Sequence, residues 1–188
     1  MTKFTVHTLE SAPAGSRPML EGLKKAFGFV PNLFAVFAES PAALQGALAI
    51  GEAFSKSTLS PVEQQLVALA VSEANDCQFC VAAHSTIAKH LAKADPALVA
   101  AAREREPLPD AKLDALVSFT RKIAEQRGFV APADLAAFLN AGYSKAQVIE
   151  VLLGVGMKTF NNYVDHIARV PLNDQFKAEA WQPKRKVA

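Results

Sequence analysis

Residues 59–84 read LSPVEQQLVALAVSEANDCQFCVAAH, and this stretch decides the fold. Its SPVE segment at positions 60–63 has the serine, proline and acid pattern of a capping box, which predicts the start of a helix. The nearly continuous apolar run at positions 66–71 then predicts that this helix is buried on most of its sides. We therefore expect a central helix here, around which the rest of the chain packs.

A second helix is expected directly after the polar interruption at Asn75-Asp76. Asp76 is a suitable N-cap, so this helix is expected to begin at Cys77 and to continue through Cys80 and His84. Residues three and four positions apart share a face of a helix, so these three side chains form a single stripe. The sequence thus predicts that two thiols and an imidazole meet near the start of one helix.

Helical signals continue along the rest of the chain, and long alternating β-branched runs are missing. Serine or aspartate followed by proline recurs at the expected helix starts. The expected helices cover about 16–27, 31–39, 40–54, 60–74, 77–87, 95–103, 111–126, 132–140 and 144–169. The C-terminal segment is expected to be partly extended and to pack through Phe176 and Trp181. We therefore expect an all-α fold, a compact multi-helix single domain over residues 1–188.

A capped apolar run occurs twice in the chain. Ser144 begins the sequence SKAQVIEVLLGV much as Ser60 begins SPVEQQLVALAV, and each serine is followed 22 to 24 residues later by a histidine, His84 or His166. Thr159 and Asn162 are expected at the second copy's equivalents of the cysteine positions. The pattern fits either two helical repeats, of which only the first is catalytic, or two unrelated amphipathic helices.

The composition indicates a globular protein without an electrostatic reason to bind nucleic acid or a membrane. Hydrophobic residues make up 51% of the chain, and 20 basic residues oppose 18 acidic ones, giving a formal charge of +2. The basic cluster at 184–186 is interpreted as a solvated terminus. No signal-peptide pattern or long apolar run is present, so we expect a cytoplasmic protein. The nine scattered glycines form no phosphate loop, and no cofactor is expected.

The cysteine pair predicts redox chemistry. A free thiol has a pKa of about 8.5, and only its thiolate is an effective nucleophile. The first turn of a helix, its positive dipole end and the nearby His84 all favour the thiolate. We expect Cys80 to attack a peroxide, Cys77 to resolve the sulfenic acid into a disulfide, and His84 to act as the base. Spacing alone leaves open which cysteine reacts first.

The stretch 59–84, with its Cys-x-x-Cys-x-x-x-His core, strongly resembles the carboxymuconolactone decarboxylase superfamily, and within it the alkylhydroperoxidase D branch. The flanks FGFVPNLFAVFAESPAAL at 27–44 and NNYVDHIARVPLNDQF at 161–176 are similar to those of other members. The resemblance implies an all-helical alkylhydroperoxidase D-like fold, a homo-oligomer that is a trimer or a hexamer, and reduction of hydroperoxide substrates by the cysteine pair. It also implies a thioredoxin-like or lipoylated protein as the electron donor.

The chain departs from this pattern at one position. Members of the branch place a glutamate twelve residues before the first cysteine, where it serves a proton relay with the histidine, but this chain has Gln65 there. Glu63 has an alternative interpretation as part of the capping box. Glu73, four residues before Cys77, is the preferred replacement, against the alternative that it is a solvated residue at a helix end.

Three other interpretations stay open. In the first, the chain is a cofactor-free lactone decarboxylase like the namesake of the superfamily, although that branch does not resemble it at the cysteine pair. In the second, the chain is a non-catalytic redox sensor whose Cys77–Cys80 disulfide alters packing. Finally, a zinc site would need a fourth ligand from His166 or Glu73 to complete a tetrahedron, so no bound metal is expected.

Overall fold

The computed structural model describes residues 3–183, and within this range it contains helices and no β-strand. The α-helices are α1 (Arg17–Phe27), α2 (Asn32–Phe37), α3 (Pro41–Ser55), α4 (Pro61–Ala74), α5 (Gln78–His90), α6 (Pro96–Glu104), α7 (Ala111–Gln126), α8 (Pro132–Asn140) and α9 (Lys145–Ala168), followed by a 3-10 helix η1 (Asp174–Glu179). The all-α expectation is confirmed. The basic cluster at 184–186 lies outside the described residues.

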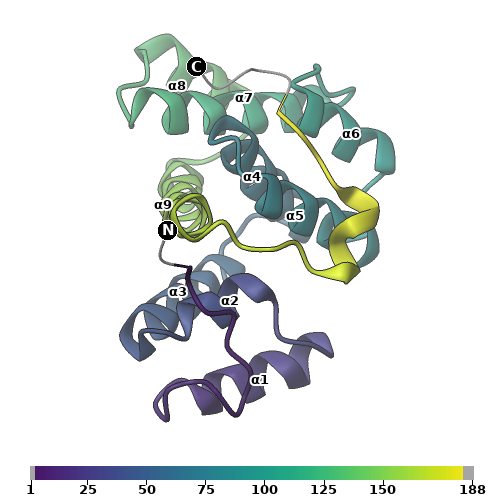
Figure 1. Ribbon diagram of the computed structural model, residues 1–188. Coiled ribbons are helices and arrows are strands. Elements are labelled where there is room, and N and C mark those ends of the chain that lie inside the picture. The colour runs from purple at the N-terminus through teal and green to yellow at the C-terminus, as the bar shows by residue number, and fades with distance from the viewer. Residues whose placement is uncertain (1–2, 184–188) are drawn as a thin grey trace.

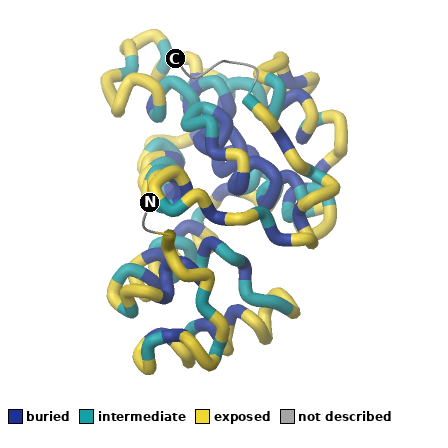
Figure 2. The backbone as a smooth tube through the Cα atoms, viewed as in Figure 1, coloured by how far each residue is buried: buried dark blue, intermediate teal, exposed yellow. Residues whose placement is uncertain are grey.

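Helix α4 lies at the centre of the packing. It contacts α5, α7 and α9, and its residues from Leu66 to Glu73 are all buried, as the apolar run predicted. Helix α9 also contacts α2 and α3, so it lies between these N-terminal helices and α4 (Figure 1). Figure 2 shows the deepest burial along α4 and α5. In the part of the chain that is described, no helix is both long and apolar enough to cross a membrane.

Helix α9 buries several polar side chains and exposes several large apolar ones, the opposite of the usual pattern of a surface helix. Its buried polar side chains are Lys158, Asn161, Asn162 and Asp165, each at most 8% exposed. Its large exposed apolar side chains are Ile149, Leu152, Phe160, Tyr163 and Ile167. At 100° per residue these two sets occupy opposite faces of the helix. The helix therefore turns its polar face inward and requires polar partners inside the protein.

The two capped apolar runs fold differently after their common start. Ser60 and Ser144 each form a complete capping box, with Glu63 and Gln147 as the reciprocal partners. The first run ends at Ala74 and a new helix follows, whereas the second continues as one helix of 24 residues. The similarity is thus confined to the cap and the apolar run, and the second half has no helix junction like the one beside the cysteines.

The α4–α5 junction corrects one local prediction. Cys77, rather than Asp76, is the N-cap of α5, and Asp76 adopts a positive φ of 55°. The chain reverses here because Cys77 N–H donates to Ser72 O at 2.9 Å and Asp76 N–H donates to Glu73 O at 3.0 Å. Aspartate tolerates this left-handed conformation better than most residues, which explains its place in the turn.

The C-terminal segment packs as expected. Phe176 and Trp181 are both buried, and Phe176 meets Phe79 of α5 in an edge-on contact with ring centroids 5.9 Å apart. Residues 174–179 form the 3-10 helix η1 instead of extended chain. This segment therefore packs against α5.

Close packing of α9 against α3 and α4 depends on Gly154. A Cβ at this position would lie 2.7 Å from Phe54 and 2.8 Å from Val67. We expect Gly154→Ala to lower the free energy of unfolding by about 1–3 kcal/mol through overpacking, despite the better helix propensity of alanine. Urea unfolding monitored by circular dichroism measures this change.

Gly156 provides the matched control, because a Cβ there meets nothing within 4 Å. Gly156→Ala is expected to leave stability unchanged or to raise it by up to about 1 kcal/mol. Equal effects at both glycines would contradict the packing role of Gly154.

Candidate active site

Both cysteines are reduced and buried at the start of α5. Cys77 is the N-cap and its carbonyl accepts from Val81 N–H at 3.0 Å, while Cys80 lies in the first turn. The two side chains lie close together, as the predicted shared face requires, and the single Cys77 S–H is shared between Cys80 and Asp165 of α9. Thiols at this end of a helix feel the positive end of its dipole, which favours a thiolate.

Asp165 of α9 is the second partner of Cys77. The Cys77 thiol donates to Asp165 Oδ2 at 3.2 Å. Burial raises the pKa of Asp165 above its ordinary value, and the thiol donor partly opposes this shift. A carboxyl group in this position can take up and return the Cys77 proton.

Cys80 is the thiolate of the pair. The hydrogen bond from Cys77, together with the charge of Lys158 and a hydrogen bond from it, lowers the pKa of Cys80 to about 6 against the effect of burial. Lys158 is only 2% exposed, so its charge acts with little solvent screening. This environment favours the thiolate form of Cys80.

Cys77 remains protonated. Burial raises its pKa, and the neighbouring Cys80 and Asp165 raise it further. A buried pair of thiols cannot easily carry two negative charges, so one proton stays between them. The environment thus shifts the pKa values of Cys80 and Cys77 in opposite directions, a distinction that the spacing did not make.

His84 lies beside Gln65. The ring Nδ1 is 2.9 Å from Gln65 Oε1, and with Nδ1–H as the donor, Nε2 remains an acceptor. Burial, followed by the charge of Lys158, holds the pKa of His84 well below its ordinary value. The imidazole is therefore neutral, and the cation that stabilises the Cys80 thiolate is Lys158 rather than a protonated His84.

Glu73 and Glu63 are both engaged elsewhere. Glu73 Oε2 lies 2.7 Å from Arg105 Nε and 3.3 Å from Arg121 Nε, in an ion cluster beside α7. These contacts argue against Glu73 as the relay carboxylate next to His84. Glu63 accepts from Ser60 N–H at 2.7 Å and from the Tyr143 hydroxyl at 2.9 Å. Its capping-box interpretation is confirmed.

A cavity of about 170 Å³ opens beside the reactive groups. Four polar side chains contribute to its lining: Cys80, His84, Lys158 and Asn161. Its remaining walls are mostly apolar and include Phe27, Phe34, Phe79, Phe176 and Met157. Asn161 Oδ1 is buried and has no hydrogen-bond partner among the described residues, which leaves an acceptor at this cavity. The cavity suits a small, mainly apolar molecule with one polar, proton-bearing end.

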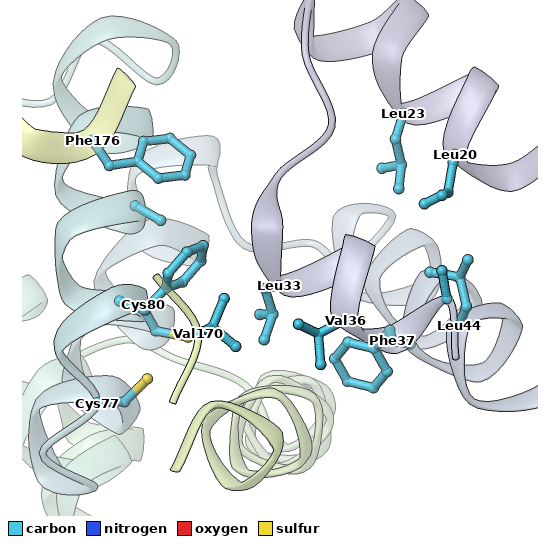
Figure 3. Packing of buried hydrophobic residues seen from close by; sticks show 14 of the residues in the cluster. Leu20, Leu23, Leu33, Val36, Phe37, Leu44, Cys77, Cys80, Val170 and Phe176 are labelled. Carbon is cyan, nitrogen blue, oxygen red and sulfur yellow. The ribbon is translucent and has the colours of Figure 1, made fainter. Parts of the chain in front are cut away.

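Apolar side chains from both halves of the molecule enclose the cysteine-bearing helix. Figure 3 shows Cys77 and Cys80 on one helix, with Val170 beside them and Leu33 and Val36 directed towards this region from α2. These residues belong to one hydrophobic cluster. The dry surroundings keep water from weakening the contacts between the charged groups.

Sequence reasoning missed Lys158 and Asp165. It considered Asn162 only as the second copy's equivalent of a cysteine position. Lys158, Asn161, Asn162 and Asp165 nevertheless belong to one stripe with spacings of three, four and seven residues from Lys158. The signal was a polar stripe within an otherwise apolar helix. Among residues 3–183, no group of three His, Cys, Asp or Glu side chains is arranged to hold a metal ion.

Comparison with known proteins supports the all-helical fold. Residues 37–121 match the Carboxymuconolactone decarboxylase family, and no curated protein matches the chain. An uncharacterized peroxidase-related protein from Ralstonia eutropha JMP134, described as an alkylhydroperoxidase AhpD core, has a TM-score of 0.82 and 23% identity over 93% of both chains.

Two further solved structures are similar. A peroxidase-related protein from Silicibacter sp. TM1040 has a TM-score of 0.79 and 22% identity, covering 93% of this chain and 95% of its own. The debrominase Bmp8, as a cysteine-to-alanine variant bound to 2,3,4-tribromopyrrole, has a TM-score of 0.80 and 17% identity, covering 95% and 96%. These likenesses establish the fold that the three proteins share with this chain.

The role of Lys158 can be tested through the ionisation of Cys80. We expect Lys158→Met to raise the pKa of Cys80 by at least about one unit, because a buried thiolate loses the cation beside it. The pH dependence of alkylation by iodoacetamide, with mass spectrometry to identify Cys80, measures the midpoint. Lys158→Arg retains the charge and is the control. A midpoint that stays near pH 6 in Lys158→Met would contradict the assignment.

Proposed function

We propose that the chain is a member of the carboxymuconolactone decarboxylase superfamily and a thiol peroxidase that reduces alkyl hydroperoxides, because residues 37–121 match that family and the chain shares the fold of an alkylhydroperoxidase-like protein. One observation carries the proposal: Cys80 lies beside the buried Lys158 and the Cys77 thiol, which lower its pKa, and it lines an apolar cavity. A nucleophile, a resolving thiol and a binding site thus meet in one place.

In the first step, the Cys80 thiolate attacks the terminal oxygen of the hydroperoxide and the O–O bond breaks. His84 Nε2 accepts the hydroxyl proton of the substrate and returns it to the departing alkoxide, which leaves as an alcohol. The Lys158 ammonium stabilises the negative charge that moves from sulfur to oxygen. Cys80 is left as a sulfenate, which is protonated to the sulfenic acid.

In the second step, Cys77 attacks the Cys80 sulfur and hydroxide departs, which leaves a disulfide. Asp165 takes the Cys77 proton through the existing hydrogen bond and gives it up to the hydroxide, which becomes water, so the poor acidity of Cys77 does not stop the attack. The resolving thiol is already in contact with Cys80. A thioredoxin-like or lipoylated protein then reduces the disulfide by thiol exchange. Two reduced cysteines suit the reducing cytoplasm.

Reductive dehalogenation of a small ring is a second candidate. The debrominase neighbour suggests it, and the phenylalanine walls of the cavity favour a flat aromatic substrate. The dithiol would supply the two electrons, the ring carbon would exchange its halogen for hydrogen, and halide would leave. Halide release from 2,3,4-tribromopyrrole by the reduced protein distinguishes this activity from peroxide reduction.

We propose that the chain forms a homo-oligomer, a trimer or a hexamer, through the exposed face of α9. This face carries five large apolar side chains in one stripe, namely Ile149, Leu152, Phe160, Tyr163 and Ile167. A contiguous apolar stripe of this length is unusual on the surface of a monomer and favours burial against another copy.

The cysteine roles predict two different defects. Cys80→Ser is expected to abolish rapid oxidation by cumene hydroperoxide, since the nucleophile is lost. Cys77→Ser is expected to react once and to accumulate a sulfenic acid, because no resolving thiol remains. Stopped-flow kinetics and trapping with dimedone measure these outcomes. Equal turnover of a lactone by the Cys77→Ser/Cys80→Ser double variant would favour a decarboxylase instead. A disulfide that forms without sustained turnover, with every reductant supplied, would favour a redox sensor.

The assembly is tested by charging the stripe on α9. Ile149→Lys/Ile167→Lys is expected to produce monomers, because charges at both ends of the stripe oppose its burial. Sedimentation velocity measures the mass. Phe129→Lys is the control, since Phe129 is 87% exposed and lies outside α9. A double variant that keeps the wild-type mass would exclude this face as the interface.

A further inference from the structure

A second opening lies next to Cys77, apart from the cavity at Cys80. This cleft of about 520 Å³ is lined by residues that include Asp76, Gln78, Asp165, Arg169 and Trp181. Of the residues that line the cleft or the cavity, Phe79 alone lines both. Phe79, one of the two residues between the cysteines in the sequence, is therefore the wall between the two openings.

The two openings differ in chemistry. Around Cys80 the lining is mostly phenylalanine and aliphatic side chains, whereas the cleft presents Arg169, His166 and two glutamines, Gln78 and Gln182. The glutamine amides are hydrogen-bonded to each other at 3.0 Å. An alkyl hydroperoxide suits the first opening, and a hydrated polar chain suits the second.

Asp165 separates the cleft from the Cys77 sulfur. It lines the cleft, and it accepts the hydrogen bond of the buried Cys77 thiol. A disulfide has no S–H donor, so oxidation removes the bond that holds this carboxylate against the sulfur. The Cys77 side of the pair thus becomes easier to approach only after the protein has been oxidised.

The leaving group determines which sulfur a reductant attacks. In thiol exchange the sulfur that departs most readily is the one with the more stable thiolate. Lys158 stabilises the Cys80 thiolate, whereas burial, Cys80 and Asp165 together outweigh the effect of the same charge on Cys77 and disfavour a Cys77 thiolate. Attack on Cys77 Sγ, with Cys80 as the leaving group, is therefore the favoured direction. This attack comes from the side of the cleft.

We propose that the cleft is a separate entrance for a reducing dithiol at the end of a slender, flexible chain, which attacks Cys77 while hydroperoxides reach Cys80 through the apolar cavity. The proposal deepens the thiol peroxidase function and rests on it. A slender chain is required because Cys77 is fully buried below the cleft, beyond the reach of a thiol on a flat protein surface.

Reduction of the Cys77–Cys80 disulfide uses both thiols of the reductant. One reductant thiol gives its proton to Asp165 and its sulfur bonds to Cys77 Sγ, while the disulfide electrons leave with the Cys80 thiolate. The second reductant thiol releases its proton to solvent and attacks the first reductant sulfur. Cys77 departs and recovers the proton from Asp165. The reductant becomes a cyclic disulfide, having lost two electrons and two protons.

The test separates the two half-reactions. Protein oxidised with diamide is reduced with dihydrolipoamide, and the fluorescence of Trp181, the single tryptophan and part of the cleft wall, reports the rate. Gln78→Phe is expected to slow this reduction at least about tenfold by blocking access, with peroxide oxidation unchanged. In Gly51→Leu the added side chain extends into the apolar cavity, since a Cβ at this position has room. This variant is expected to slow only oxidation by cumene hydroperoxide.

A control variant and direct identification of the attacked cysteine complete the experiment. Gln126→Phe places the same ring on an exposed position at the end of α7 and is expected to change neither rate. Acid quenching of the oxidised protein with glutathione, followed by peptide mass spectrometry, is expected to locate the adduct on Cys77. This identification uses the unsubstituted protein, so it does not depend on whether a cleft variant folds.

The outcomes are distinct. An adduct on Cys80, or Gln78→Phe and Gly51→Leu slowing the same half-reaction, would overturn the separate entrance. If peroxide fails to oxidise the reduced protein but Gln78→Phe still slows reduction of the diamide-oxidised form, the cleft assignment stands and the peroxidase function falls.

Discussion

The buried contact between the polar face of α9 and the α4–α5 junction is the constraint on which the site depends. A lysine and an aspartate are costly to bury, and each is compensated by a sulfur: Lys158 by the Cys80 thiolate and Asp165 by the Cys77 thiol. Because the buried polar side chains of α9 make this contact, its large apolar side chains face solvent. The chemistry of the site and the proposed assembly thus share one cause.

The same contact makes the two cysteines unequal. A cation close to one sulfur and a carboxylate close to the other separate their proton affinities, although the sequence presents them as a simple pair. The more stable thiolate is the better nucleophile towards peroxide at neutral pH and also the better leaving group when the disulfide is reduced. One electrostatic asymmetry therefore directs both halves of the proposed cycle, and Phe79 keeps their two openings apart.

The sequence alone determined the elements whose causes are local. Capping boxes at Ser60 and Ser144 form as predicted, and the helices at 111–126 and 132–140 begin and end at the predicted residues. The Cys-x-x-Cys-x-x-x-His spacing likewise placed the thiols together, because one helical turn brings such residues onto one face. Caps, apolar periodicity and helical spacing all depend on residues within a few positions of each other.

Only the tertiary structure decided the electrostatics. Asp165 meets Cys77 across 88 positions of the chain, and Lys158 comes from the same distant helix. Glu73, close to the cysteines in sequence, is instead paired with Arg105, which lies 32 residues away. Which charge compensates another inside a protein depends on how helices pack, since burial removes the competing water. That choice is made by long-range contacts that no local pattern contains.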